Sequence, residues 1–153
     1  MLITLGAYYC QAHNRPDCWS APQLQRLFAL SAPNTVLVVA ILHANNHRDR
    51  DHDRRYGAVT LANSLSLTAS RNVLLAQIVT AFVAIVVAAV LFDALSMLVA
   101  LLAAPLAIGV FKRASKNHVQ GDFVEQVAGL HACVGLLIVG ALVGQVLLLL
   151  PLR

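Results

Sequence analysis

The stretch Val73–Phe92, which reads VLLAQIVTAFVAIVVAAVLF, decides the fold class because it contains no charged residue. A helix needs about 20 apolar residues, or about 17 at the short end, to cross the hydrocarbon core of a bilayer. Three further stretches meet this requirement: Leu27–Ala44, Leu95–Phe111 and Val127–Leu150. The apolar start, Met1–Cys10, covers only about half a bilayer. We therefore predict an all-α integral membrane protein, a multi-helix bundle with about four transmembrane helices plus the tail of a fifth.

The overall composition agrees with a membrane location. Hydrophobic residues make up 59% of the 153 residues and charged residues 12%, whereas soluble domains contain about half and about a quarter. The net charge is +4, but the basic residues stand between apolar stretches and form no continuous face. This distribution argues against a nucleic-acid partner. The three cysteines show no metal-binding or redox spacing, so we expect free thiols.

The connections between the predicted helices indicate the topology. Only Asp93-Ala94 separates the second span from the third, which predicts a tight hairpin. A hairpin returns the chain to the side it left, so the connections before and after it share one side. Both are basic: Arg48, Arg50, Arg54, Arg55 and Arg71 stand in the first, and Lys112, Arg113 and Lys116 in the second. The positive-inside rule makes that side cytoplasmic, although it names no organelle. The segment Gln11–Arg26 is expected on the opposite side.

The last predicted helix contains a small-x-x-x-small pattern at Gly140 and Gly144. Such spacing lets two helix backbones approach closely. Packing inside the bundle is the preferred interpretation, and a homo-oligomer contact is the alternative.

Most of the chain's polarity is concentrated in Asn45–Arg55, at the end of the first predicted span. This segment holds three carboxylates, four arginines, two histidines and two asparagines. If the helix continues for another turn, Asp49 and Asp53 share a face with their Cβ atoms about 5–6 Å apart. Two such carboxylates suit Mg²⁺, which keeps several waters and often binds substrate phosphates as well. A solvated, charge-rich loop is the alternative interpretation.

Other polar residues of the segment can assist or stay structural. Arg48 lies beside the carboxylate pair, and arginine contacts phosphate oxygens well. Asn45 and Asn46 can hydrogen-bond a phosphate or orient a metal-bound water. The histidines have no standard metal-ligand spacing, and we interpret them as local hydrogen-bonding groups.

The segment and the residues after it spell N-N-x-R-D-x-x-x-D-R-x-x-G-x-x-T-L from Asn45 to Leu61. This pattern resembles the second aspartate motif of the UbiA prenyltransferase superfamily, in its menaquinone-type branch. Weaker likeness extends over the chain, at Leu5–Tyr9 and at Gly129–His131. The resemblance identifies residues 1–153 as a single transmembrane domain, the C-terminal part of a nine-helix fold. From Met1 to His43 no first aspartate motif is found, so we expect an N-terminal truncation.

The resemblance also implies a function. Members of the family transfer an isoprenyl chain from its diphosphate to an aromatic acceptor, here of the naphthoquinol kind used for menaquinone and other vitamin K-type quinones. Mg²⁺ is the implied cofactor, and membrane lipid surrounds the site. Asp49 and Asp53 are the implied catalytic metal ligands, and the implied diphosphate-binding residues are Asn45, Asn46, Arg48 and Arg54. With one motif only, the chain alone is expected to lack transfer activity. The alternative is an inactive remnant or a small structural or partner membrane protein.

Overall fold

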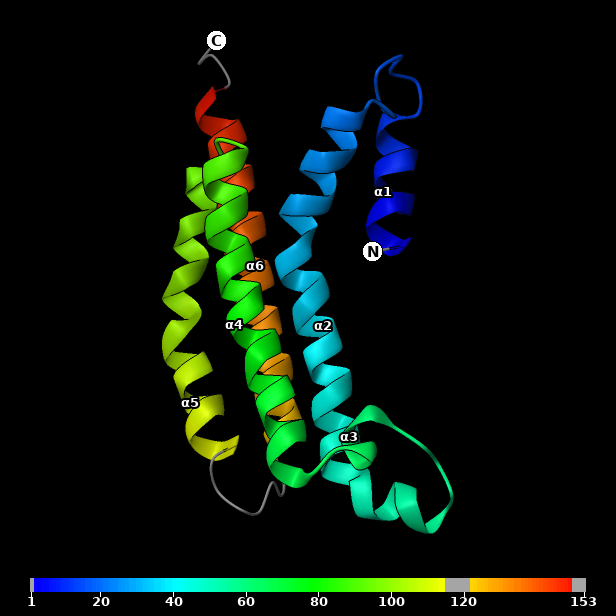
Figure 1. Cartoon of the computed structure of the whole chain (residues 1–153). Coiled ribbons are helices and arrows are strands. Elements are labelled where there is room, and N and C mark those ends of the chain that lie inside the picture. Colours follow the sequence, from blue (N-terminus) through cyan, green and yellow to red (C-terminus); the bar gives the residue numbers. More distant parts are fainter. Residues whose placement is uncertain (1, 115–121, 150–153) are drawn as a thin grey trace.

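A computed structural model describes residues 2–114 and 122–149, and this part of the chain consists of helices and the connections between them, without strands. Figure 1 shows the order of the helices along the chain. They are α1 (Leu2–Ala12), α2 (Ala21–Arg55), α3 (Leu61–Ser64), α4 (Leu67–Leu91), the 3₁₀-helix η1 (Leu95–Ala103), α5 (Ala104–Ala114) and α6 (Phe123–Leu149). The predicted all-α class is confirmed.

Four spans are long and apolar enough to cross a membrane: α2, α4, η1 together with α5, and α6. They coincide with the four predicted spans, which are therefore confirmed. The first is much longer than predicted, because α2 begins at Ala21 and ends at Arg55. Pro22 lies at the first turn, where its missing N–H and fixed φ are compatible with a helix. Pro33 lies inside α2, as membrane helices tolerate.

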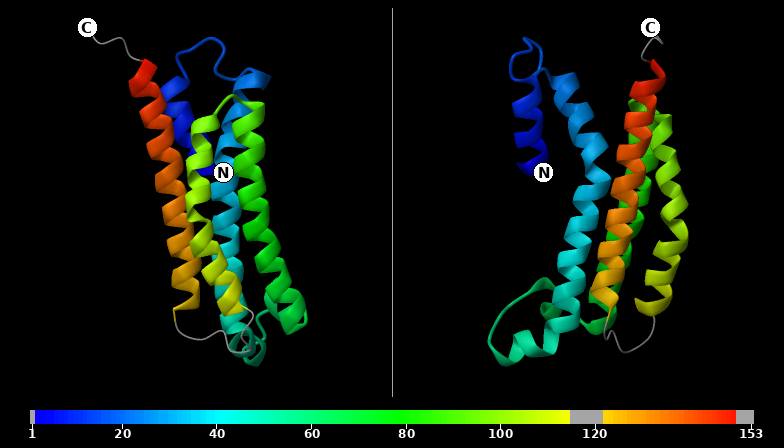
Figure 2. Two further views of the ribbon diagram at one scale, coloured as in Figure 1. Left: turned by 90° about the vertical axis from the view of Figure 1, so that its left-hand side faces the viewer. Right: turned by 180° about the vertical axis from the view of Figure 1, so that it is seen from behind.

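The four spans pack side by side into a bundle, with α2 against α4 and α6, and η1 against α4 and α6 (Figure 2). Alanines line much of the contact surface, and their small side chains let the helix backbones approach closely. Between them lie large side chains that are almost fully buried: Leu37, Leu74, Ile78, Ile85, Met97, Leu130 and Val134. Large apolar residues also face outward, including Val83, Val90, Leu102 and Leu136. Such an outer surface suits contact with lipid.

The hairpin between α4 and η1 is as tight as predicted. Asp93 adopts φ 51°, in the left-handed region that aspartate tolerates better than most residues. The amide of Ala94 donates to the carbonyl of Ala89 at 3.0 Å and so closes the turn. Near this end of the bundle, Ser96 Oγ donates to Gln145 Oε1 at 2.9 Å and ties η1 to α6.

The two ends of the bundle carry different segments. Residues 45–66 lie at one end, hereafter the motif end, together with the C-terminal end of α5 and the start of α6 (Figure 1). The connection between α1 and α2 lies at the opposite end, so the predicted separation of these segments is confirmed. There, the Tyr8 hydroxyl donates to the Cys18 carbonyl at 2.8 Å. All three cysteines are free, as predicted.

Gly140 and Gly144 do not pack as expected. A Cβ added at either position would meet no atom within 4 Å, and Gly140 is exposed. The interpretation as a contact inside the bundle is therefore wrong. A contact between copies of the chain stays a prediction.

Candidate functional site

Helix α2 continues without interruption through Asn45–Arg55, the charged part of the motif. The condition under which Asp49 and Asp53 share a face is therefore met. At 3.6 residues per turn, Asn45, Asp49 and Asp53 follow one side of the helix, with Asn46 at its edge. His43, His47, Arg50 and Arg54 follow the opposite side. We call these two sides the outer and the inner face of the motif.

The outer face holds a compact group of charged and polar side chains. Arg48 donates from Nε to one carboxylate oxygen of Asp49 at 2.7 Å, and from Nη2 to the other at 2.9 Å. The same Nη2 also donates to Asn45 Oδ1 at 2.8 Å. The Arg48 and Asp49 side chains keep 39% and 36% of their surface exposed. The structure thus brings Asn45, Arg48 and Asp49 together where a ligand can reach them.

Asn46 and Asp53 lie near this group and are half-buried. Asp53 stands one turn beyond Asp49 on the same face. Glu125, in the first turn of α6, is close enough to act electrostatically on the Arg48 guanidinium. The outer face therefore contains both carboxylates, two amides and one arginine.

The donor set of the outer face fits magnesium in its chemistry. No group of three or more histidine, cysteine or carboxylate side chains that could hold a metal occurs among residues 2–114 and 122–149. Two carboxylates and neighbouring amide oxygens are an incomplete set, and Mg²⁺ characteristically completes such a set with waters and substrate phosphates. Arg48 donates to both Asp49 oxygens in this arrangement.

The inner face forms a buried polar network with α4. His43 and His47 each keep only 4% of their surface exposed, and Ser70 none. His43 Nε2 donates to the Ser70 carbonyl at 2.9 Å, since a carbonyl only accepts. The Ser70 hydroxyl lies 2.7 Å from His47 Nδ1 and 3.2 Å from His43 Nε2. His43 and His47 are hydrogen-bonding groups, as predicted, but their partner lies on α4 and is not local. Sequence reasoning missed Ser70, because no local pattern predicts a hydrogen-bond partner 23 or more residues away.

Two inner-face arginines hold the connection that follows α2. Arg50 Nη2 donates to the Leu65 carbonyl at 2.9 Å, and Arg54 Nε to the Asn63 carbonyl at 3.2 Å. Arg54 therefore points away from Asp49 and toward the connection, although the sequence placed it with the diphosphate-binding residues. That assignment stays a prediction, while its observed role is to fix the backbone after the motif.

Asn63 organises the same connection from within. Its side-chain Nδ2 donates to the Ala58 carbonyl at 2.7 Å, and its side-chain Oδ1 accepts from the backbone N–H of Thr60 at 3.0 Å. Thr60 Oγ1 in turn accepts from the backbone N–H of Asn63 at 3.2 Å, which completes a capping box at α3. Gly57 turns the chain away from α2 with φ +73°, a conformation in which glycine has no Cβ penalty. The capping box of α3 has asparagine where the usual sequence signature has Glu or Gln, so the sequence gives only a weak signal for this helix.

A groove of about 660 Å³ lies along α2 between Leu27 and Val39, on the side of the motif that leads toward the opposite end of the bundle. Its lining comes from α1, α2 and α6 and includes Asn34, Val38 and Ile138. Val38 and Asn34 lie seven and eleven residues before Asn45, so they continue the outer face of the motif. Asn34 Oδ1 is buried without a hydrogen-bond partner. A Cβ at Gly135 would lie 3.4 Å from that oxygen, so glycine there leaves room for the asparagine.

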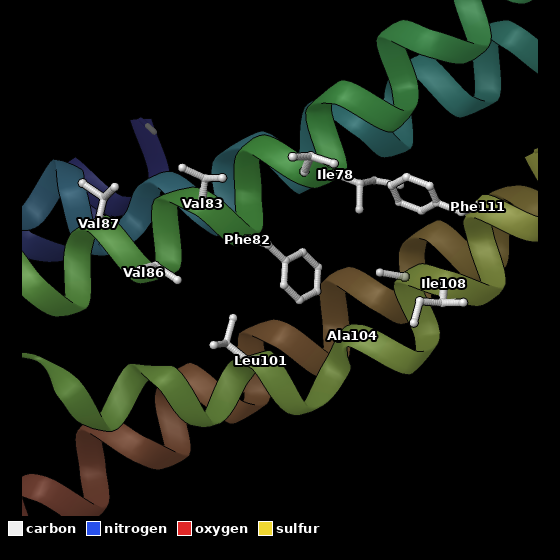
Figure 3. Close-up of a pocket in the computed structure, with 11 residues that line it drawn as sticks. Ile78, Phe82, Val83, Val86, Val87, Leu101, Ala104, Ile108 and Phe111 are labelled. Carbon is white, nitrogen blue, oxygen red and sulfur yellow. The ribbon is translucent and has the colours of Figure 1, made fainter.

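A second pocket, of about 500 Å³, lies between α4 and the η1–α5 rod (Figure 3). Phe82 and Phe111 contribute rings, and branched aliphatic residues such as Val83 and Ile108 complete the lining. All its lining residues are apolar, so it offers nothing that would orient a charged group. The pocket fits hydrocarbon, whereas the outer face of α2 carries the polar chemistry.

Comparison with known proteins assigns the family. A family model described as the UbiA prenyltransferase family matches residues 1–123. No curated protein and no solved structure matches the chain. The matched segment includes the motif, the connection after it and three of the four membrane spans. Because the match covers well over half of the 153 residues, the chain belongs to the UbiA prenyltransferase family.

Proposed function

We propose that the outer face of α2 binds the magnesium–diphosphate group of an isoprenyl diphosphate, in a prenyl transfer to an aromatic acceptor. The observation that carries the proposal is the accessible Asn45–Arg48–Asp49 group at the end of a membrane span. Family membership supports prenyl transfer in general. The motif spelling supports an acceptor of the naphthoquinol kind, and hence a place in menaquinone or vitamin K-type quinone formation.

Each residue of the outer face has a separate part in this proposal. Asp49 and Asp53 supply the oxygens that hold Mg²⁺, which when bound neutralises negative charge on the departing diphosphate. Arg48 donates to phosphate oxygens, and charge-assisted bonds of this kind are strong. Asn45 keeps Arg48 oriented through its Oδ1. Asn46 adds an amide donor at the edge of the same face.

The apolar isoprenyl chain needs a path from the motif into the membrane, and the exposed side of α2 leads from Asn45 past Leu42 to the groove, which begins at Val39. Val38 and Leu42, on the membrane side of Asn45, are 52% and 61% exposed. A chain lying against them is screened from water and held in line with the diphosphate, and such positioning lowers the barrier to transfer. The positive-inside rule supports a cytoplasmic location for the diphosphate end.

The experiment is binding of an isoprenyl diphosphate to the detergent-solubilised chain, with Mg²⁺ and with EDTA. We expect a magnesium-dependent component of binding, and this component is lost in the double variant Asp49→Ala, Asp53→Ala. Asp51→Ala is the matched control. Asp51 lies on the same turns of α2, but it is exposed and lies outside the face that Asp49 and Asp53 share. Binding that is equal in all three proteins, or indifferent to Mg²⁺, contradicts the proposal.

A further inference from the structure

Two arginines at the motif end have buried guanidinium nitrogens without partners. Arg50, on the inner face of α2, is only 8% exposed, and its Nη1 has no hydrogen-bond partner. Arg71, in the second turn of α4, has a buried Nε that also lacks a partner. The bond from Arg50 Nη2 to the Leu65 carbonyl fixes that guanidinium and leaves Nη1 as the open donor. Both open groups are N–H donors on permanently charged side chains.

The surroundings of the two arginines concentrate positive potential. The charges of Arg50 and Arg71 both act on His47, which is hydrogen-bonded to Ser70 immediately before Arg71 in the chain. The N-terminus of α4 lies here as well, capped by Ser66, and a helix N-terminus carries a partial positive charge. The ion pairs found within residues 2–114 and 122–149 are Arg48–Asp49 and Arg113–Asp122, so neither Arg50 nor Arg71 has a carboxylate partner there.

A water molecule can satisfy an N–H group but leaves the charge uncompensated. Burying an unpaired charge is strongly unfavourable, and the penalty falls when an opposite charge supplies hydrogen bonds as well. A phosphate group meets both needs, since its oxygens accept several bonds and arginine is suited to them in geometry and charge. We propose that Arg50 and Arg71 form a binding site for a phosphate group between α2 and α4 at the motif end.

This site is separate from the one on the outer face. Arg50 projects about 100° around α2 from Asp49 and bonds to the Leu65 carbonyl, and no carboxylate is needed to bind the anion. Binding to the arginine site should therefore persist in EDTA and in the Asp49→Ala, Asp53→Ala double variant. The proposed magnesium–diphosphate site should lose its ligand in both conditions. Failure of one proposal is thus distinguishable from failure of the other.

The phosphate can belong to a membrane lipid headgroup or to a free ion, and two arms separate these sources. In the first, inorganic phosphate is titrated in EDTA onto the purified chain in an uncharged, phosphate-free detergent, and binding is followed by calorimetry. In the second, the chain is released from phosphatidylglycerol nanodiscs, and native mass spectrometry counts the lipids that stay bound. The variants are Arg50→Gln and Arg71→Gln, with Arg55→Gln, an exposed arginine on the same helix, as the matched control.

We expect saturable binding in at least one arm, about ten- to a hundredfold weaker in Arg50→Gln and Arg71→Gln, and unchanged in Arg55→Gln. Phosphate binding in the first arm identifies a free ion, and retention of phosphatidylglycerol in the second identifies a lipid. If Arg50→Gln fails to fold, Arg71→Gln and Arg50→Lys carry the comparison, and Arg50→Lys should weaken binding less than Arg71→Gln does. No binding by the wild-type chain in either arm, or equal binding in all variants, overturns the proposal.

Discussion

Replacing Ser70 by alanine tests the buried network between α2 and α4. The substitution removes the only hydroxyl that lies within 2.7 Å of His47 Nδ1 in the described structure. His43 keeps its bond to the Ser70 carbonyl at 2.9 Å. One buried polar atom is therefore left unsatisfied, and that costs about 1–3 kcal/mol. The lost oxygen is small, so its cavity adds little. We expect the free energy of unfolding to fall by about 1–3 kcal/mol.

Reversible unfolding in mixed detergent micelles, followed by circular dichroism, measures this change. Thr68→Ala, an exposed position one turn or less away on α4, is the control and should stay within about 0.5 kcal/mol of wild type. In a His47→Leu background the imidazole is gone, so Ser70→Ala should cost less there, with a coupling energy of about 1 kcal/mol or more. A cost for Ser70→Ala below about 0.5 kcal/mol, or the same cost in both backgrounds, would refute the reasoning.

Three further predictions concern the connections at the motif end. Asn63→Ala removes the capping box of α3 and should lower the stability of this connection by about 0.5–2 kcal/mol. Protease cleavage between α2 and α4 should then be faster, and unchanged cleavage would contradict the prediction. Gly57→Ala places a Cβ on a residue at φ +73° and should cost about 1–2 kcal/mol in unfolding measurements, whereas a neutral result would mean that the backbone relaxes. The hydrogen bond from Arg113 lowers the pKa of Asp122 below its ordinary 3.8, so the pair's contribution is present above that value and is lost as the pH falls through the lowered pKa. Carboxyl carbon chemical shifts should show the pKa of Asp122 rising in Arg113→Gln, and an unchanged pKa would rule out the pairing in solution.

The membrane spans could be predicted from the sequence because their signal is local. About 20 consecutive apolar residues suffice, and the hairpin at Asp93 follows from the two residues left between two spans. The boundaries of α2 were less predictable, since its last turns are charged and resemble a loop in composition. Those turns remain helical in the structure, where Arg50 and Arg54 bond to the carbonyls of the following connection. Such bonds depend on tertiary placement and leave no periodic pattern.

The candidate site divides in the same way. The common face of Asp49 and Asp53, with Arg48 beside them, follows from helical spacing once the helix is known to continue. The direction of the Arg54 side chain could not be predicted from its residue type, because arginine serves equally well as a phosphate ligand and as a donor to backbone carbonyls. The unpartnered Asn34 oxygen required knowledge of where α6 passes, since Gly135 of that helix leaves the room it occupies.

The 3₁₀ segment η1 has a consequence for how the chain matches the thickness of its bilayer. The span Leu95–Ala114 has 20 residues, the fewest of the four, and would measure about 30 Å as an α-helix. Its nine 3₁₀ residues rise about 2.0 Å each, which lengthens the rod to about 34 Å. A change of that segment from 3₁₀ to α geometry would shorten the span by about 4 Å. We expect thin membranes to favour the α conformation of this segment and thick membranes the 3₁₀ conformation, so that bilayer thickness selects between two helical conformations of one span.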